Sequence, residues 1–105
     1  MENLLRRLDV ALAAADDSDI GAMWLQSYAD CLAETGYGLP AEVCLYWNGQ
    51  FQIGTEKDLG DDDQNLFIAR LTFKMAGTTS LKDLVGERVM EIRNSILGQA
   101  KAVGR

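Results

Sequence analysis

The sequence contains no histidine, and this absence bears on several classes of function at once. Histidine is the usual general base near neutral pH and the commonest metal ligand. Without it, no serine–histidine or cysteine–histidine nucleophile pair can form within the chain. A zinc site would have to rely on two cysteines and carboxylates, an uncommon ligand set. We therefore expect no catalytic, metal-binding or cofactor-binding residue, and a protein that is not an enzyme.

Cysteines and long apolar runs are also scarce. Cys31 and Cys44 are too few for a disulfide framework, and buried thiols that act as small hydrophobic groups explain both. No apolar run approaches the roughly 18 residues that a membrane span requires. Residues 1–7 lack the basic end, apolar run and small cleavage residues of a secretory signal. These features favour a cytoplasmic protein.

The chain has 105 residues, a length that predicts a single domain over residues 1–105. Its net charge of −6 is unevenly distributed. Residues 1–65 contain thirteen acids and three bases, whereas residues 66–105 contain three acids and seven bases. Acidic surfaces repel nucleic acid and anionic membranes and attract basic partners. We expect neither direct nucleic-acid nor membrane binding. The alternative is that the acids only keep the protein soluble.

Apolar spacing predicts two helices in the first third of the chain. Residues 2–15 carry leucines at helical spacing. Residues 16–19 offer N-caps to a second helix, over residues 20–34, which Gly36 would end. Apolar residues cover more than half of the circumference of this second helix. Such a helix is either enclosed in the core or partly kept for a partner.

Another long helix is predicted at the C-terminal end. Ser80 and Asp83 resemble a capping box, and an apolar stripe then continues from Leu81 to Val103. Met90 and Leu97 lie at the edge of this stripe and could form a homodimer contact. Two helix-interior glycines either permit the close approach of another backbone or are simply tolerated. They are Gly86 and Gly98.

A β-hairpin is the clearest local signal. Residues 42–47 and 50–53 flank Asn48–Gly49, a pair that favours a two-residue type I′ turn. That turn would pair Tyr46 with Phe51 and Cys44 with Ile53, on the face that we expect to be buried. Val43, Leu45 and Trp47 would then share the opposite face with two glutamines.

The sequence predicts a loop over residues 54–65 and leaves residues 66–75 open between strand and helix. Alternating apolar residues favour a strand, which would extend the hairpin to a three-stranded antiparallel sheet. The expected fold class is therefore α+β, with two N-terminal helices, this sheet and the long C-terminal helix.

Two acidic segments and two aromatic residues are the candidate partner-binding sites. Trp47 is expected to be exposed beside the turn, and Tyr37 lies in a glycine-flanked loop. The segment from Asp61 to Asn65 begins like an EF-hand loop, but the later ligand positions do not match. The acidic candidates are Asp16, Asp17, Asp19, Glu56, Asp58, Asp61, Asp62 and Asp63.

Three classes of function are compatible with these features. The leading hypothesis is a small protein-binding module, an inhibitor, adaptor or chaperone, that engages a partner with a basic surface. In the second, the acidic residues imitate a phosphate backbone and block a nucleic-acid-binding machine, as phage or mobile-element anti-defence inhibitors do. The third is an enzyme that depends on carboxylates or cysteine.

Overall fold

The elements follow the order expected of an α+β chain. The computed structural model describes the backbone of residues 2–103 and the side chains of residues 3–75 and 77–98. The helices are α1 (Glu2–Ala14), α2 (Gly21–Thr35), the short α3 (Glu56–Leu59) and α4 (Leu81–Val103), with a 3₁₀ helix η1 (Phe73–Gly77). The strands are β1 (Glu42–Trp47), β2 (Phe51–Gly54) and β3 (Leu66–Thr72), in the antiparallel order β2-β1-β3. The predicted fold class is confirmed.

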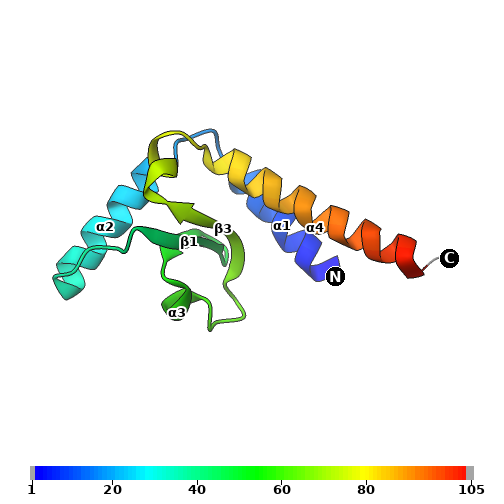
Figure 1. Ribbon diagram of the computed structural model, residues 1–105, viewed down its shortest axis with the longest axis horizontal. Coiled ribbons are helices and arrows are strands. Elements are labelled where there is room, and N and C mark those ends of the chain that lie inside the picture. Colours follow the sequence, from blue (N-terminus) through cyan, green and yellow to red (C-terminus); the bar gives the residue numbers. More distant parts are fainter. Residues whose placement is uncertain (1, 104–105) are drawn as a thin grey trace.

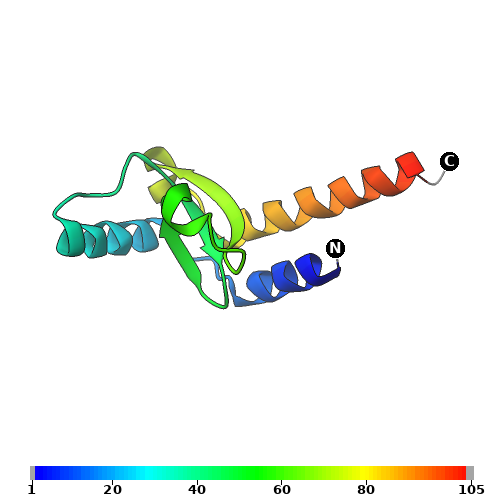
Figure 2. The same ribbon diagram turned by 90° about the horizontal axis from the view of Figure 1, so that it is seen from below.

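The helices extend from the sheet in two directions (Figure 1). α1 and α4 lie side by side on one side, whereas α2 points the opposite way, as the turned view also shows (Figure 2). An ion pair of 2.9 Å between Arg93 and Asp9 joins α4 to α1. This arrangement makes the molecule elongated, with extents of 55 × 28 × 22 Å.

The ends of the long helices are set by local hydrogen bonds. Gly36 ends α2 in the left-handed conformation, with φ +79°, and its N–H donates to the Leu32 carbonyl. The Asp19 carboxylate accepts the N–H of Gly21 at 2.6 Å, and Ser80 Oγ accepts the N–H of Asp83 at 3.1 Å. Ser80 and Gly36 therefore act as predicted, whereas the prediction of an N-cap within residues 16–19 is wrong. The N-cap of α2 is Ile20, which makes no side-chain capping bond, and Asp19 lies one residue before it.

The hairpin forms where the sequence predicts it, but its predicted register is wrong. Trp47 pairs with Phe51, and Leu45 pairs with Ile53, so the loop has three residues, 48–50. Asn48 does not adopt positive φ, which a type I′ turn would require, and only Gly49 does, at +100°. Because side chains alternate along a strand, this one-residue shift places Phe51 and Ile53 on the face of Leu45 and Trp47 instead of the face of Cys44 and Tyr46.

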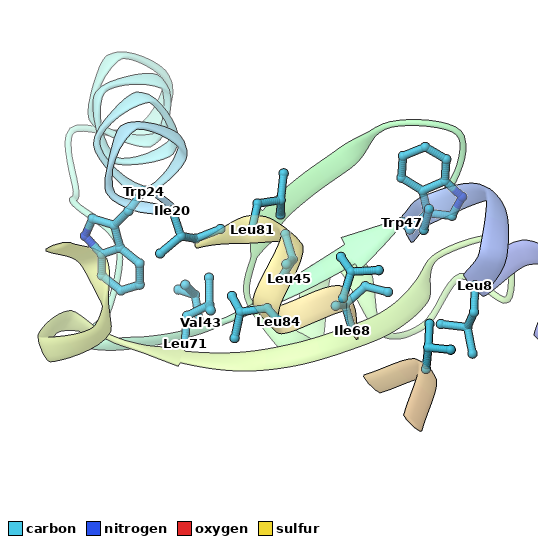
Figure 3. Packing of buried hydrophobic residues seen from close by; sticks show 13 residues of the cluster. Leu8, Ile20, Trp24, Val43, Leu45, Trp47, Ile68, Leu71, Leu81 and Leu84 are labelled. Carbon is cyan, nitrogen blue, oxygen red and sulfur yellow. The ribbon is translucent and has the colours of Figure 1, made fainter. Parts of the chain in front are cut away.

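The main core lies on the face of the sheet that we expected to be exposed. Val43, Leu45 and Trp47 are buried there beneath α1, α2 and α4, with exposed fractions of at most 7%. Figure 3 shows Trp24 and Ile20 at one end of this cluster and Trp47 and Leu8 at the other. The helices contribute Leu8, Ala11, Trp24, Leu81, Leu84, Val85 and Val89, and Ile20 joins them from the position just before α2.

The ambiguous segment is a strand over residues 66–72, but the strand prediction for residues 73–75 is wrong. An irregularity opposite Leu45 and Tyr46 interrupts the alternation, so that Ile68 and Leu71 are buried in the core. Phe67 instead lies against Tyr46, with ring centroids 5.8 Å apart. Because the chain turns into η1 at Phe73, the Phe73 side chain is 69% exposed.

The second face of the sheet is covered by α3, a helix that the loop prediction for residues 54–65 missed. Thr55 caps it by accepting the N–H of Asp58 at 3.2 Å. Leu59 lies so close to Gly54 that a Cβ at position 54 would stand 2.8 Å from its side chain. Cys44 is buried as predicted, but on this second face, and Tyr46 is buried beside it.

Candidate protein-interaction surfaces

α2 exposes a broad apolar surface. Helical residues are about 100° apart around the axis, so positions 22, 25, 29, 32 and 33 share one side of α2. This side is exposed, and Leu25 and Leu32 on it are 67% and 44% exposed. Tyr28 borders it and is 42% exposed. We call this surface the α2 face, composed of Ala22, Leu25, Tyr28, Ala29, Leu32 and Ala33.

The α2 face carries no charged residue, which distinguishes it from an ordinary solvated helix face. The charged residues of α2 are Asp30 and Glu34, and both lie on the flank toward β2. Gln26 donates a hydrogen bond of 2.9 Å to the Asp30 carboxylate on that flank. α2 contains no lysine or arginine. The helix is therefore apolar on its outer face and purely acidic along one border.

Two further aromatic side chains are exposed near α2. Tyr37 is 78% exposed just beyond the end of the helix, and its N–H donates to Thr35 Oγ1 at 3.1 Å. Its side chain is therefore accessible, as a partner-binding role would require. Phe73 packs edge-on against Trp24, with ring centroids 6.1 Å apart, while much of its ring remains in solvent. Because the sequence favours a strand over residues 73–75, it does not single out Phe73 as a candidate binding residue.

Trp47 is not part of any exposed surface. It is 7% exposed and packs against Phe51, at a centroid distance of 4.6 Å, within the main core. The prediction that Trp47 is exposed is therefore wrong, because the sheet face that Trp47 shares with Val43 and Leu45 is the one that the helices cover.

The first acidic segment, residues 16–19, supports the start of α4. The Asp16 carbonyl accepts the N–H of Lys82 at 2.9 Å, and the Ser18 carbonyl accepts that of Leu81 at 3.0 Å. The Asp16 carboxylate accepts hydrogen bonds from the Ser18 hydroxyl and N–H, which lower the pKa of Asp16. The backbone carbonyls of residues 16–19 thus accept N–H groups that have no partner within the first turn of α4. The Asp17 side chain remains exposed.

The second acidic segment, residues 56–63, lies around α3. Arg70 pairs with Glu42 at 2.8 Å and lies 3.6 Å from Glu56. The Asp62 carboxylate accepts the N–H of Gln64, which closes a local turn. The other acids of the segment are exposed, namely Asp58, Asp61 and Asp63.

The structure does not bring the two acidic segments together. Residues 16–19 lie at the junction of α1, α2 and α4, whereas α3 lies on the far side of the sheet (Figure 1). Within the described side chains, no three ligand-type residues are grouped closely enough to hold a metal ion. The acidic segments are therefore separate surfaces.

The thiols are separate as well. Cys44 is buried and Cys31 half-buried, and neither forms a disulfide. Burial beside Cys44 raises the pKa of Tyr46 to about 12, which keeps its phenol neutral. The neutral Tyr46 side chain therefore packs as part of the second sheet face, against Phe67.

Met90 and Leu97 are 62% and 60% exposed on α4, so both are accessible for the predicted homodimer contact.

No helix in the described part of the chain is long and apolar enough to cross a membrane. Comparison of the sequence and structure with protein-family models, curated proteins and solved structures yields no match.

Proposed function

We propose that this protein is a small protein-binding module whose α2 face docks on an apolar partner surface bordered by basic residues. The observation that carries the proposal is the exposed, charge-free α2 face with its leucines at positions 25 and 32. Single exposed apolar residues are ordinary, whereas a contiguous apolar patch is typical of an interaction site. Such a role fits an inhibitor, an adaptor or a chaperone.

Burial of the α2 face would supply the main favourable free energy of binding. Fully burying a leucine side chain contributes about 1.5–3 kcal/mol. Leu25 and Leu32 are only partly hidden by the protein itself, so about two thirds of this contribution for Leu25 and somewhat less than half for Leu32 are still available to a partner. Tyr28 is held in place because its ring packs against Gly38, a position where a Cβ would have no room. An aromatic side chain of fixed geometry loses little conformational entropy on binding.

The charges next to the α2 face indicate the character of the partner. Asp30 and Glu34 border it, and α2 offers no base that would attract an acidic partner. Lysine or arginine beside an apolar partner surface would complement these acids. We further propose the cytoplasm as the compartment, since Cys31 and Cys44 are both free thiols.

The two alternatives have less geometric support. Imitation of a phosphate backbone by both acidic segments would require one continuous surface, whereas they lie on different sides of the sheet. Each segment would then have to act alone. The carboxylate- or cysteine-dependent enzyme has no cluster of such groups to build on among the described side chains. The binding module is therefore the function that we propose.

Site-specific crosslinking tests this function. A photo-crosslinking amino acid at position 25 is expected to capture one partner in the cells that produce the protein. The matched control places the same amino acid at Val10 of α1, which is 53% exposed but outside the α2 face. The captured protein is then purified and titrated with the wild type and with the Leu25→Ser, Leu32→Ser double variant.

We expect capture from position 25 only. The double variant should bind at least about tenfold more weakly, because it removes the apolar centre of the interface. Affinity should also fall with added salt, because the border is acidic. Equal capture from positions 10 and 25, or equal affinity of the double variant, would contradict the proposal.

A further inference from the structure

A second surface, distinct from the α2 face, lies along the first half of α4. It is a shallow groove of about 1070 Å³ between α4, the end of α1 and the segment that joins α1 to α2. Leu12, Val89 and Met90 contribute its apolar side chains, and Gly86 lies among them. We call it the α4 groove. Its remaining lining residues are Asp17, Thr78, Thr79, Lys82, Asp83, Glu87, Glu91 and Asn94.

Gly86 has no role in the packing of the fold. A Cβ at this position would meet nothing within 4 Å, because the position opens into the groove. Glycine in a helix interior costs about 1 kcal/mol relative to alanine. Backbone geometry does not require it either, since Gly86 lies within the regular helix α4 and is not at positive φ. What glycine does provide is a helix surface that another backbone can approach closely.

The α4 groove is predominantly acidic. Four acids line it against one base, Lys82. Glu91 is engaged by Arg88 at 2.8 Å, whereas Asp17, Asp83 and Glu87 form no ion pair with any described side chain. An apolar floor with an acidic rim is complementary to a helix that has one apolar face and basic flanks.

We propose that the α4 groove binds a basic amphipathic helix of a partner protein, with the backbone of that helix packed closely over Gly86. This inference does not depend on the α2 face, because α2 contributes no residue to the lining of the groove and points away from the sheet in the direction opposite to α4 (Figure 1). With two docking surfaces, this small domain could hold two segments of a partner. The segment in the α4 groove would be the basic amphipathic helix.

A designed peptide tests the groove directly. The probe is an amphipathic helical peptide of leucine and lysine, compared with an otherwise identical peptide in which glutamate replaces lysine. Titration into isotopically labelled protein, followed by NMR, should shift the backbone signals of residues 82–94 and leave those of residues 22–33 unchanged. The affinity for the lysine peptide should fall with added salt, because the rim is acidic.

Two glycine variants provide a matched pair. Gly86→Leu places a side chain in the groove, whereas Gly98→Leu places one on the same helix, at an exposed position that also has open space but does not line the groove. Both changes favour the helix, so both variants should fold. Gly86→Leu should weaken binding of the lysine peptide at least about tenfold, and Gly98→Leu should alter it less than about twofold.

Several results would overturn the assignment. They are the absence of binding, preference for the glutamate peptide, shifts confined to α2, and equal binding by the two glycine variants. Because the probe shares nothing with the partner captured through position 25, failure of the groove would leave the proposed function of the α2 face intact. The converse also holds.

Discussion

Trp47 and Phe51 face each other across the hairpin, with ring centroids 4.6 Å apart and ring planes inclined at 56°. This pairing closes a three-residue loop and places Phe51 beside Trp47 on the face of the sheet that α1, α2 and α4 cover. The same register places Cys44 and Tyr46 against α3 on the second face. With both faces of β1 covered, Val43–Trp47 are all buried, and Trp47 is not accessible to a partner.

Replacement of Trp47 tests this register. We expect Trp47→Ala to lower the free energy of unfolding by about 3–5 kcal/mol, because it leaves a large cavity in the core. Tyr37→Ala, at a position 78% exposed, is the control and should change it by less than about 0.5 kcal/mol. Urea denaturation followed by circular dichroism measures both. A cost below about 1 kcal/mol for Trp47→Ala would favour the alternative register, in which Trp47 faces solvent.

Three glycine-to-alanine variants should separate conformation from space. Gly86→Ala and Gly98→Ala should each raise the free energy of unfolding by about 0.5–1 kcal/mol, since alanine favours the helix and its Cβ meets nothing. Gly36→Ala should lower it by about 1 kcal/mol, because position 36 adopts φ +79°. Thermal and urea unfolding give the three values. If the free energy of unfolding changed in the same direction in all three variants, positive φ would not be what requires glycine at position 36.

Tyr46 should make the protein sensitive to alkaline pH. The folded state holds the phenol neutral up to a pKa of about 12, whereas the unfolded chain loses the proton near its ordinary pKa of 10.0. The unfolded state therefore binds fewer protons between these values. The free energy of unfolding should fall with rising pH there, by about 1.4 kcal/mol per pH unit at most.

Urea denaturation at several pH values, together with tyrosinate absorbance near 295 nm, tests the effect of Tyr46. The control is Tyr46→Phe, which removes the ionisable group and should make the slope of stability against pH shallower above pH 10. An unchanged slope in Tyr46→Phe would assign the alkaline sensitivity to another group.

The α2 face should be dispensable for folding. We expect Leu25→Ser to change the free energy of unfolding by less than about 0.5 kcal/mol, because its side chain is 67% exposed, and Leu32→Ser to lower it by about 1 kcal/mol, because its side chain is 44% exposed. The buried Trp24 of the same helix is the comparison, and Trp24→Ala should cost about 3–5 kcal/mol. Urea denaturation of the three variants decides. A cost of several kcal/mol for either serine variant would make the α2 face part of the structural core.

Local signals in the sequence determined most of the secondary structure. Gly36 ends α2, and Ser80 caps α4, because both act through hydrogen bonds to neighbouring residues. The hairpin site, the long apolar stripe of α4 and the α+β class depend on spacing within a single segment. The over-wide apolar coverage of α2 left two outcomes open, and the structure shows that part of this apolar surface is exposed.

The tertiary structure alone decided the register, the faces and the surfaces. Asn48–Gly49 is compatible with loops of two or three residues, and packing against the helices selected the longer one. The interrupted alternation in β3 and the exposure of Phe73 follow from that same packing. The two acidic segments, separated by 36 residues or more in the sequence, could be placed on different sides of the sheet only once the chain was folded. Contacts between distant segments depend on burial summed over the whole core, and no single stretch of sequence contains that sum.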